Sequence, residues 1–67
     1  MPLSARNQLP GSVKSIKLGA VMAEVVVDVN GSEVVAAITR SSVESLGIKE
    51  GSRVTAIIKA TEVMIAT

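Results

Sequence analysis

Residues 20–38, A-V-M-A-E-V-V-V-D-V-N-G-S-E-V-V-A-A-I, predict a β-hairpin that organises the rest of the fold. Apolar side chains recur at every second position over residues 20–29, which is the period of a half-buried strand. Asn30-Gly31 follows, and this dipeptide is the strongest short-range hairpin signal because both residues tolerate a positive φ. A return strand is therefore predicted over residues 33–38.

The segments that flank this hairpin predict three further strands. Residues 11–18 and 53–59 alternate well enough to be strands, and residues 63–66 form a short fifth one. Alternation over residues 11–18 is imperfect, which indicates a bend or bulge marked by Gly11 or Gly19. All five glycines are assigned to turns or helix caps, and no two stand at phosphate-loop spacing.

One short helix is predicted between the third and fourth strands. Ser41-Ser42-Val43-Glu44 matches a capping box, in which a hydroxyl and a glutamate bond the free N–H groups of the first turn. Gly47 then ends the helix after about two turns as a left-handed C-cap. The order of three strands, one helix and two strands predicts an all-β fold, a small five-stranded OB-like Greek-key barrel.

The chain length predicts a single domain over residues 1–67, with a core of marginal stability. Hydrophobic residues nevertheless make up 48% of the chain. The second, third and fourth predicted strands carry apolar residues on both faces, for example Ile57 opposite Ile58. Because a barrel has only one interior, the second apolar face is expected to contact another subunit, and we expect a homo-oligomer.

Composition excludes several classes of function. The chain has no His, Cys, Phe, Tyr or Trp, and its formal net charge is +1. Without His or Cys it lacks a His-based triad, a thiol nucleophile and an ordinary transition-metal site, so we expect neither an enzyme nor a directly bound metal cation. No apolar stretch reaches the ~18 residues of a membrane span, and no signal-peptide layout is present, so a cytoplasmic protein without a membrane partner is expected.

Three clusters of hydrogen-bond donors are present in this chain of few polar residue types, and none contains a paired carboxylate. Such clusters suit the capture of an oxyanion, because charged and hydroxyl donors replace its hydration shell. The start of the predicted helix adds free N–H groups that favour an anion. Each cluster also has a structural alternative: a polar arm, a plain N-cap or a solvated edge charge. The clusters are Ser4, Arg6 and Asn7; Thr39, Ser41 and Ser42; and Lys59, Ala60 and Thr61.

The opening Ser4-Ala5-Arg6-Asn7-Gln8 resembles the S-A-R-N-Q start of the molbindin, or Mop, domain, an OB-like molybdate-binding family of the TOBE type. The similarity continues in the same order through most of the chain. It includes residues 23–25, residues 37–39 with Ser42, residues 46–47 with 50–51, and residues 54–65.

That resemblance implies a cytoplasmic protein that binds molybdate, and tungstate with it, between the subunits of a hexamer built as a trimer of dimers. A lone copy of the domain points to molybdenum storage and homeostasis. The oxyanion would be held without any bond being made or broken, with Arg6 and Lys59 offsetting most of its charge. The family's anion-binding positions correspond to Ser4, Arg6, Thr39, Ser42, Lys59 and Ala60.

Two alternatives from other classes remain open at this stage. An OB-type nucleic-acid-binding domain would use aromatic stacking platforms in a basic groove, and this chain has no aromatic residue and little net charge. A purely structural oligomerisation module would form the same oligomer, but its assembly and stability would not depend on oxyanions.

Overall fold

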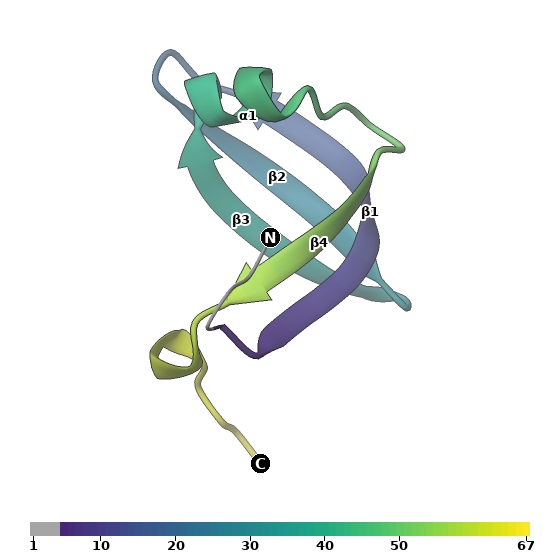
Figure 1. Cartoon of the computed structure of the whole chain (residues 1–67), viewed down its shortest axis with the longest axis vertical. Helices are drawn as coiled ribbons and strands as arrows, with labels where there is room; N and C mark the ends of the chain where they lie inside the picture. Colours follow the sequence, from purple (N-terminus) through teal and green to yellow (C-terminus); the bar gives the residue numbers. More distant parts are fainter. Residues whose placement is uncertain (1–4) are drawn as a thin grey trace.

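Four strands and two short helical segments make up the structure, a computed structural model that describes residues 5–67. The strands form one antiparallel sheet in the order β3-β2-β1-β4 (Figure 1). As the sequence predicts, the fold is mostly β with one short helix between the third and fourth strands. The elements are β1 (Asn7–Leu18), β2 (Met22–Val29), β3 (Ser32–Thr39), α1 (Arg40–Leu46), β4 (Arg53–Ile58) and the 3-10 helix η1 (Ala60–Glu62).

The central hairpin is confirmed. β2 and β3 pair from Met22 opposite Thr39 to Val29 opposite Ser32. Asn30 and Gly31 have φ angles of 50° and 89°, the positive values that the turn requires. A side chain of β2 stabilises the turn, because the Gly31 N–H donates to Asp28 Oδ1 at 2.9 Å.

β1 begins at Asn7, four residues earlier than predicted. Asn7, a member of the N-terminal donor cluster, therefore belongs to the sheet. The first half of β1 pairs with β4 and its second half with β2. The predicted irregularity is confirmed, but Lys14 occupies it: the register with β2 shifts between Val13 and Ser15. A bulge of this kind bends the strand, which lets β1 serve both neighbours.

Gly11 lies inside β1 and is buried, so its assignment to a turn was wrong. The reason is a close approach of two strands. A Cβ at this position would overlap the backbone carbonyl oxygen of Asp28 on β2 and lie 3.0 Å from Val27 Cγ1. Glycine is therefore required here by the space between strands, with no need for an unusual φ.

Thr39 caps helix α1, so the predicted capping box at residues 41–44 was wrong. β3 extends as far as Thr39, and the Thr39 Oγ1 accepts a hydrogen bond from the Ser42 N–H at 3.1 Å. The predicted C-cap is confirmed: Gly47 has a φ of 65°, and its N–H donates to the carbonyl of Val43 at 3.1 Å and of Glu44 at 3.2 Å.

The predicted fifth strand and closed barrel are not formed within the described residues. β3 and β4 are both edges of an open sheet, and residues 63–66 join no strand of this chain. The chain turns after β4 through η1, where the Glu62 N–H donates to the Lys59 carbonyl at 2.8 Å. This turn directs the C-terminal segment away from the sheet (Figure 1).

The core is small and aliphatic. Alternate residues of β2 point inward, as predicted, and α1 contributes one buried side chain that packs over β2 and β3. Large apolar side chains remain exposed on the outer faces, including Val35 on β3 at 61% and Ile57 on β4 at 48%, so the prediction of two apolar faces is confirmed. The buried core consists of Val13, Ala23, Val25, Val27 and Val43.

The bulge residue Lys14 forms an exposed salt bridge with Glu33 on β3. The hydrogen bond to Glu33, its charge and that of Asp28 raise the pKa of Lys14 above 10.5. A raised lysine pKa stabilises the folded chain below pH 10.5, and this contribution is lost as pH rises through the folded-state value.

We therefore expect Glu33→Gln to lower the pKa of Lys14, measured by NMR titration. The urea midpoint at pH 7 should barely change, because exposed ion pairs contribute little. An unchanged pKa in Glu33→Gln would show that the salt bridge does not form in solution.

Candidate functional site

The N-terminal cluster and the cluster after β4 lie together at one end of the β1–β4 ladder. Asn7 on β1 pairs with Ile58 on β4. Continuing the antiparallel register by one residue places Arg6 opposite Lys59, and both residues are exposed. Two cationic residues therefore follow the last pair of the β1–β4 ladder, one on each side.

Two side-chain hydrogen bonds fix this end of the chain. The Asn7 Nδ2 donates to the Ile58 carbonyl at 3.0 Å, and the Gln8 Nε2 donates to the Ala5 carbonyl at 2.9 Å. One amide hydrogen of Asn7 is therefore used to tie the N-terminal segment to β4. Ser4, the remaining member of this cluster, lies outside the described residues.

The charges at this end favour an anion. Like charges placed directly opposite each other across two strands destabilise the pair unless a counter-charge is bound. Glu62, at the end of η1, is the acidic residue of the adjoining turn. The backbone N–H groups of Ala60 and Thr61 precede the first hydrogen bond of η1, as the first N–H groups of any helix do, and add neutral donors.

The hydroxyl cluster at the start of α1 is linked internally. The Thr39 Oγ1 lies 2.7 Å from Ser42 Oγ and 3.4 Å from Ser41 Oγ. Thr39 and Ser41 are exposed and Ser42 is half-buried. Because the Thr39 oxygen already accepts the Ser42 N–H, the hydroxyl hydrogens that remain are the donors this cluster offers to a ligand.

The structure does not bring this hydroxyl cluster to the two cations. Thr39 pairs with Met22, beside the end of the 12-residue β1, whereas Arg6 and Lys59 lie at its beginning. α1 and the end of β4 accordingly lie at opposite ends of the sheet (Figure 1). One small anion cannot contact all three clusters of a single chain.

Arg40 is a cation that was not among the candidates. It is the first residue of α1, its N–H donates to the Val21 carbonyl at 2.7 Å, and its Nη1 donates to the Gly19 carbonyl at 3.2 Å. These bonds join α1 to the β1–β2 turn beside Thr39. In the sequence, Arg40 could have been selected as a candidate because it lies between Thr39 and Ser41, two members of the hydroxyl cluster.

Thr39→Ala is expected to destabilise the folded chain by about 1 kcal/mol, because it removes the N-cap of α1. Thr39→Ser retains the hydroxyl and should stay near wild type. Urea unfolding at a fixed protein concentration measures both. Ser45→Ala, on the exposed part of the same helix, is the matched control. Equal unfolding midpoints for Thr39→Ala and Thr39→Ser would contradict the assignment of Thr39 as the cap.

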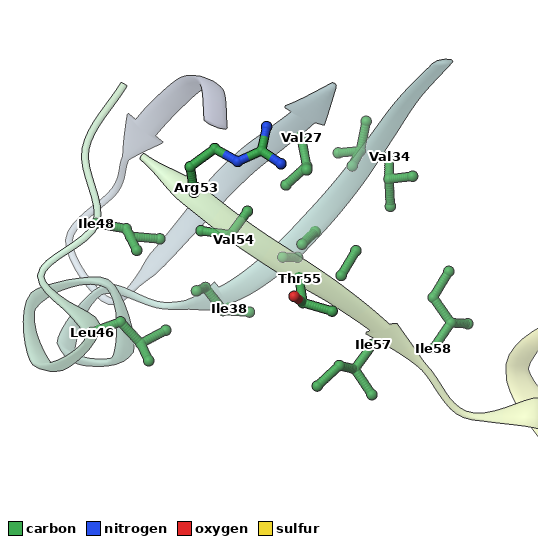
Figure 2. A pocket seen from close by; sticks show the side chains of 14 residues that line it. Val27, Val34, Ile38, Leu46, Ile48, Arg53, Val54, Thr55, Ile57 and Ile58 are labelled. Atoms are coloured by element: carbon green, nitrogen blue, oxygen red, sulfur yellow. The ribbon is translucent and has the colours of Figure 1, made fainter. Parts of the chain in front are cut away.

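A separate apolar groove lies between β3 and β4, with a volume of about 740 Å³ (Figure 2). Aliphatic side chains make up nearly all of its lining, and Arg53 and Thr55 are its polar members. None of the eight candidate donors among residues 5–67 lines it. The groove therefore does not have the chemistry of an oxyanion site.

Two further properties concern residues 5–67. No three His, Cys, Asp or Glu side chains among them are grouped so as to hold a metal ion. No helix in this part of the chain is long and apolar enough to cross a membrane.

Comparison with known proteins places the sequence in a defined group. The TOBE domain family matches residues 3–65. Molybdenum-pterin-binding protein 3 of Clostridium pasteurianum is 52% identical over 66 residues, which is 97% of each chain. The structure of a molybdate-binding protein from Sporomusa ovata superposes with a TM-score of 0.95 at 48% identity and covers both chains completely.

A molybdate-bound structure is also similar. The cytoplasmic molybdate-binding protein ModG, crystallised with molybdate, has a TM-score of 0.85 and 46% identity. The match covers 90% of this chain and 43% of that one.

Proposed function

Because the chain belongs to the TOBE domain family, we propose that it binds molybdate, and tungstate with it, for molybdenum storage and homeostasis in the cytoplasm. Similar proteins are named for binding molybdate or molybdenum-pterin. We propose further that residues 1–67 act as one OB-like domain, and that the protein binds its ligand without catalysis.

The observation that carries this proposal is the pairing of Asn7 with Ile58, since Arg6 and Lys59 are the next residues at that end of the ladder. A tetrahedral dianion between these side chains relieves their mutual repulsion and accepts charge-assisted hydrogen bonds from both. The N–H groups of Ala60 and Thr61 lie in the adjoining turn and add donors of the kind that replace an anion's hydration shell.

Selectivity is proposed to follow from a site that contains no carboxylate acceptor. Molybdate is fully deprotonated near neutral pH and can accept from every donor around it. Phosphate is partly protonated at this pH, and its own O–H would find no carboxylate to accept it, so a hydroxyl of the site would have to accept that hydrogen bond in place of donating one. Sulfate is also a dianion, so discrimination against it rests on the size of the cavity.

Each site is proposed to lie between subunits. The hydroxyl cluster and the two cations occupy opposite ends of one chain, so a site that uses all of them needs more than one copy (Figure 1). This agrees with a hexamer arranged as a trimer of dimers, in which the exposed apolar faces are covered. The proposed binding residues are Ser4, Arg6, Asn7, Thr39, Ser41, Ser42, Lys59, Ala60 and Thr61.

Calorimetric titration tests the proposal directly. We expect heat from molybdate and from tungstate that saturates, and none from sulfate or phosphate at the same concentration and ionic strength. Equal heats from all four anions would show only nonspecific attraction between charges and would contradict the proposal.

A structural oligomerisation module is the second candidate, favoured by the exposed apolar side chains of β3 and β4. An absence of any saturable response to the four anions in this titration would favour that role.

A further inference from the structure

The turn of the central hairpin contains two adjacent residues that can react with each other. Asn30 is exposed, and asparagine is among the chemically labile residues. Gly31 follows it and has no side chain to shield its backbone nitrogen, which can attack the side-chain amide of Asn30. Asn7, the other asparagine of the chain, precedes Gln8, whose side chain crowds the same attack. Asn30-Gly31 is therefore the candidate site of a spontaneous modification.

The reaction is a deamidation whose only co-reactant is water. The Gly31 nitrogen bonds Cγ of Asn30, the bond from Cγ to Nδ2 breaks, and the hydrogen of the Gly31 nitrogen leaves with Nδ2 as ammonia. The product is a cyclic imide. Water then opens this ring at either of its carbonyl groups, which yields aspartate or isoaspartate. Nothing is oxidised or reduced, and position 30 gains a negative charge.

The backbone conformation of the turn opposes the attack. Asn30 has a φ of 50°, in the left-handed region where ψ is also positive. At such a ψ the Asn30 side chain and the Gly31 nitrogen lie on opposite sides of the Cα–C bond. The nitrogen therefore reaches Cγ only after the backbone rotates. The pairing of Val29 with Ser32, directly beside the turn, opposes this rotation.

Asp28 adds a second restraint, on the attacking nitrogen itself. The Gly31 N–H donates to Asp28 Oδ1 at 2.9 Å. The attack requires this nitrogen to lose its hydrogen, and a carboxylate beside it disfavours the negative charge that then forms. A carboxylate, with an ordinary pKa of about 3.9, is also too weak a base to remove an amide hydrogen. The bond to Asp28 therefore protects the turn and does not activate it.

We propose that Asn30-Gly31 is a deamidation site that the closed hairpin suppresses, and that Asp28 restrains its nucleophile. Modification then occurs in chains whose β2–β3 turn has opened. Isoaspartate lengthens the backbone of a two-residue turn whose geometry matches the twist of its strands, and aspartate adds a charge beside Asp28. Either product weakens the pairing of β2, which supplies three of the five buried core residues. This inference goes beyond the proposed function and does not depend on an oxyanion.

Mass spectrometry of proteolytic peptides measures the reaction, because deamidation replaces an amide –NH2 with –OH. The purified protein is kept in mildly alkaline buffer, with and without guanidinium chloride, and the Asn30 peptide is sampled over time. A synthetic peptide of residues 26–35 corrects for direct effects of the denaturant. We expect the reaction to be at least about tenfold slower in native buffer, because it waits for the turn to open. Equal corrected rates in the two buffers would overturn the proposal without the use of any variant.

Asp28→Ala separates the effect of Asp28 from that of the backbone. We expect deamidation in native buffer to become at least about threefold faster, the factor for one exposed hydrogen bond. Glu33→Gln is the matched control, because it removes the same charge from the register partner of Asp28, and Glu33 bonds Lys14. Urea unfolding of each variant gives the contribution of fully unfolded chains, which is subtracted. A corrected rate in Asp28→Ala no higher than in Glu33→Gln would overturn the role of Asp28.

Discussion

Arg6→Ala is expected to lower the affinity for molybdate by about 10- to 100-fold, so that high-affinity binding is lost. The guanidinium provides charge-assisted hydrogen bonds, each of which contributes roughly 1.5–3 kcal/mol when its partner is charged. Lys59 remains opposite the vacated position and retains part of the attraction. Arg6 is exposed in the single chain and lies outside the core, so the oligomer should persist, with reduced stability.

Calorimetric titration with molybdate measures this loss, and native mass spectrometry of the same sample reports the oligomer. Lys49→Ala is the matched control, because it removes one positive charge from an exposed loop away from both cations. We expect its affinity to stay within about twofold of wild type, since distant exposed charges are screened. Normal binding by Arg6→Ala would show that the N-terminal cluster is not part of the site.

Gly11→Ala is expected to destabilise the fold by about 3 kcal/mol, at the upper end of ordinary overpacking costs. The added Cβ would meet the Asp28 carbonyl oxygen, which is backbone and cannot rotate aside, and crowd Val27 Cγ1 and Val29 Cγ2 at 3.0 Å each. β1 and β2 must therefore separate locally. A domain of this length has a total stability of about 3–10 kcal/mol, so much of it would be lost.

Urea unfolding at a fixed protein concentration checks this result, because oligomer stability depends on concentration. Ser12→Ala, the next residue of β1, is the control and should change the free energy of unfolding by less than about 1 kcal/mol. A Gly11→Ala variant as stable as Ser12→Ala would mean that the two strands are not packed as closely as the structure shows.

Locally encoded features of the fold were predictable from the sequence. Asn30 and Gly31 have the positive φ angles that their dipeptide indicates, and Gly47 ends α1 as predicted. The alternation of β2 identified its buried face, because one face of that strand contacts the core. In each case the residues that determine the structure are adjacent in the sequence.

Features that depend on distant pairing were not predictable. The early start of β1 depends on β4, through the bond from Asn7 to the Ile58 carbonyl. Several neighbouring hydroxyls satisfy a capping pattern, and the length of β3 decides that Thr39 is the cap. Gly11 resembles a turn residue until the distance between two strands is known.

The candidate site likewise has features that were predictable from the sequence and features that depend on distant pairing. Residue chemistry alone selected three donor clusters, because charged and hydroxyl donors without carboxylates are rare in this composition. Which clusters lie at the same end depends on strand register. The pairing of Asn7 with Ile58 brings Arg6 and Lys59 to one end of the sheet, and the pairing of Met22 with Thr39 places the hydroxyls at the other end. Sequence patterns do not specify that register.

Native mass spectrometry of the purified protein, with and without molybdate, tests most directly whether the anion is bound between copies. Sulfate at equal concentration is the control. We predict a hexamer that gains several molybdates and no sulfate, with bound molybdate retained only by the intact oligomer. An oligomer whose mass does not change with molybdate, or molybdate carried by isolated single chains, would contradict binding of the anion between copies.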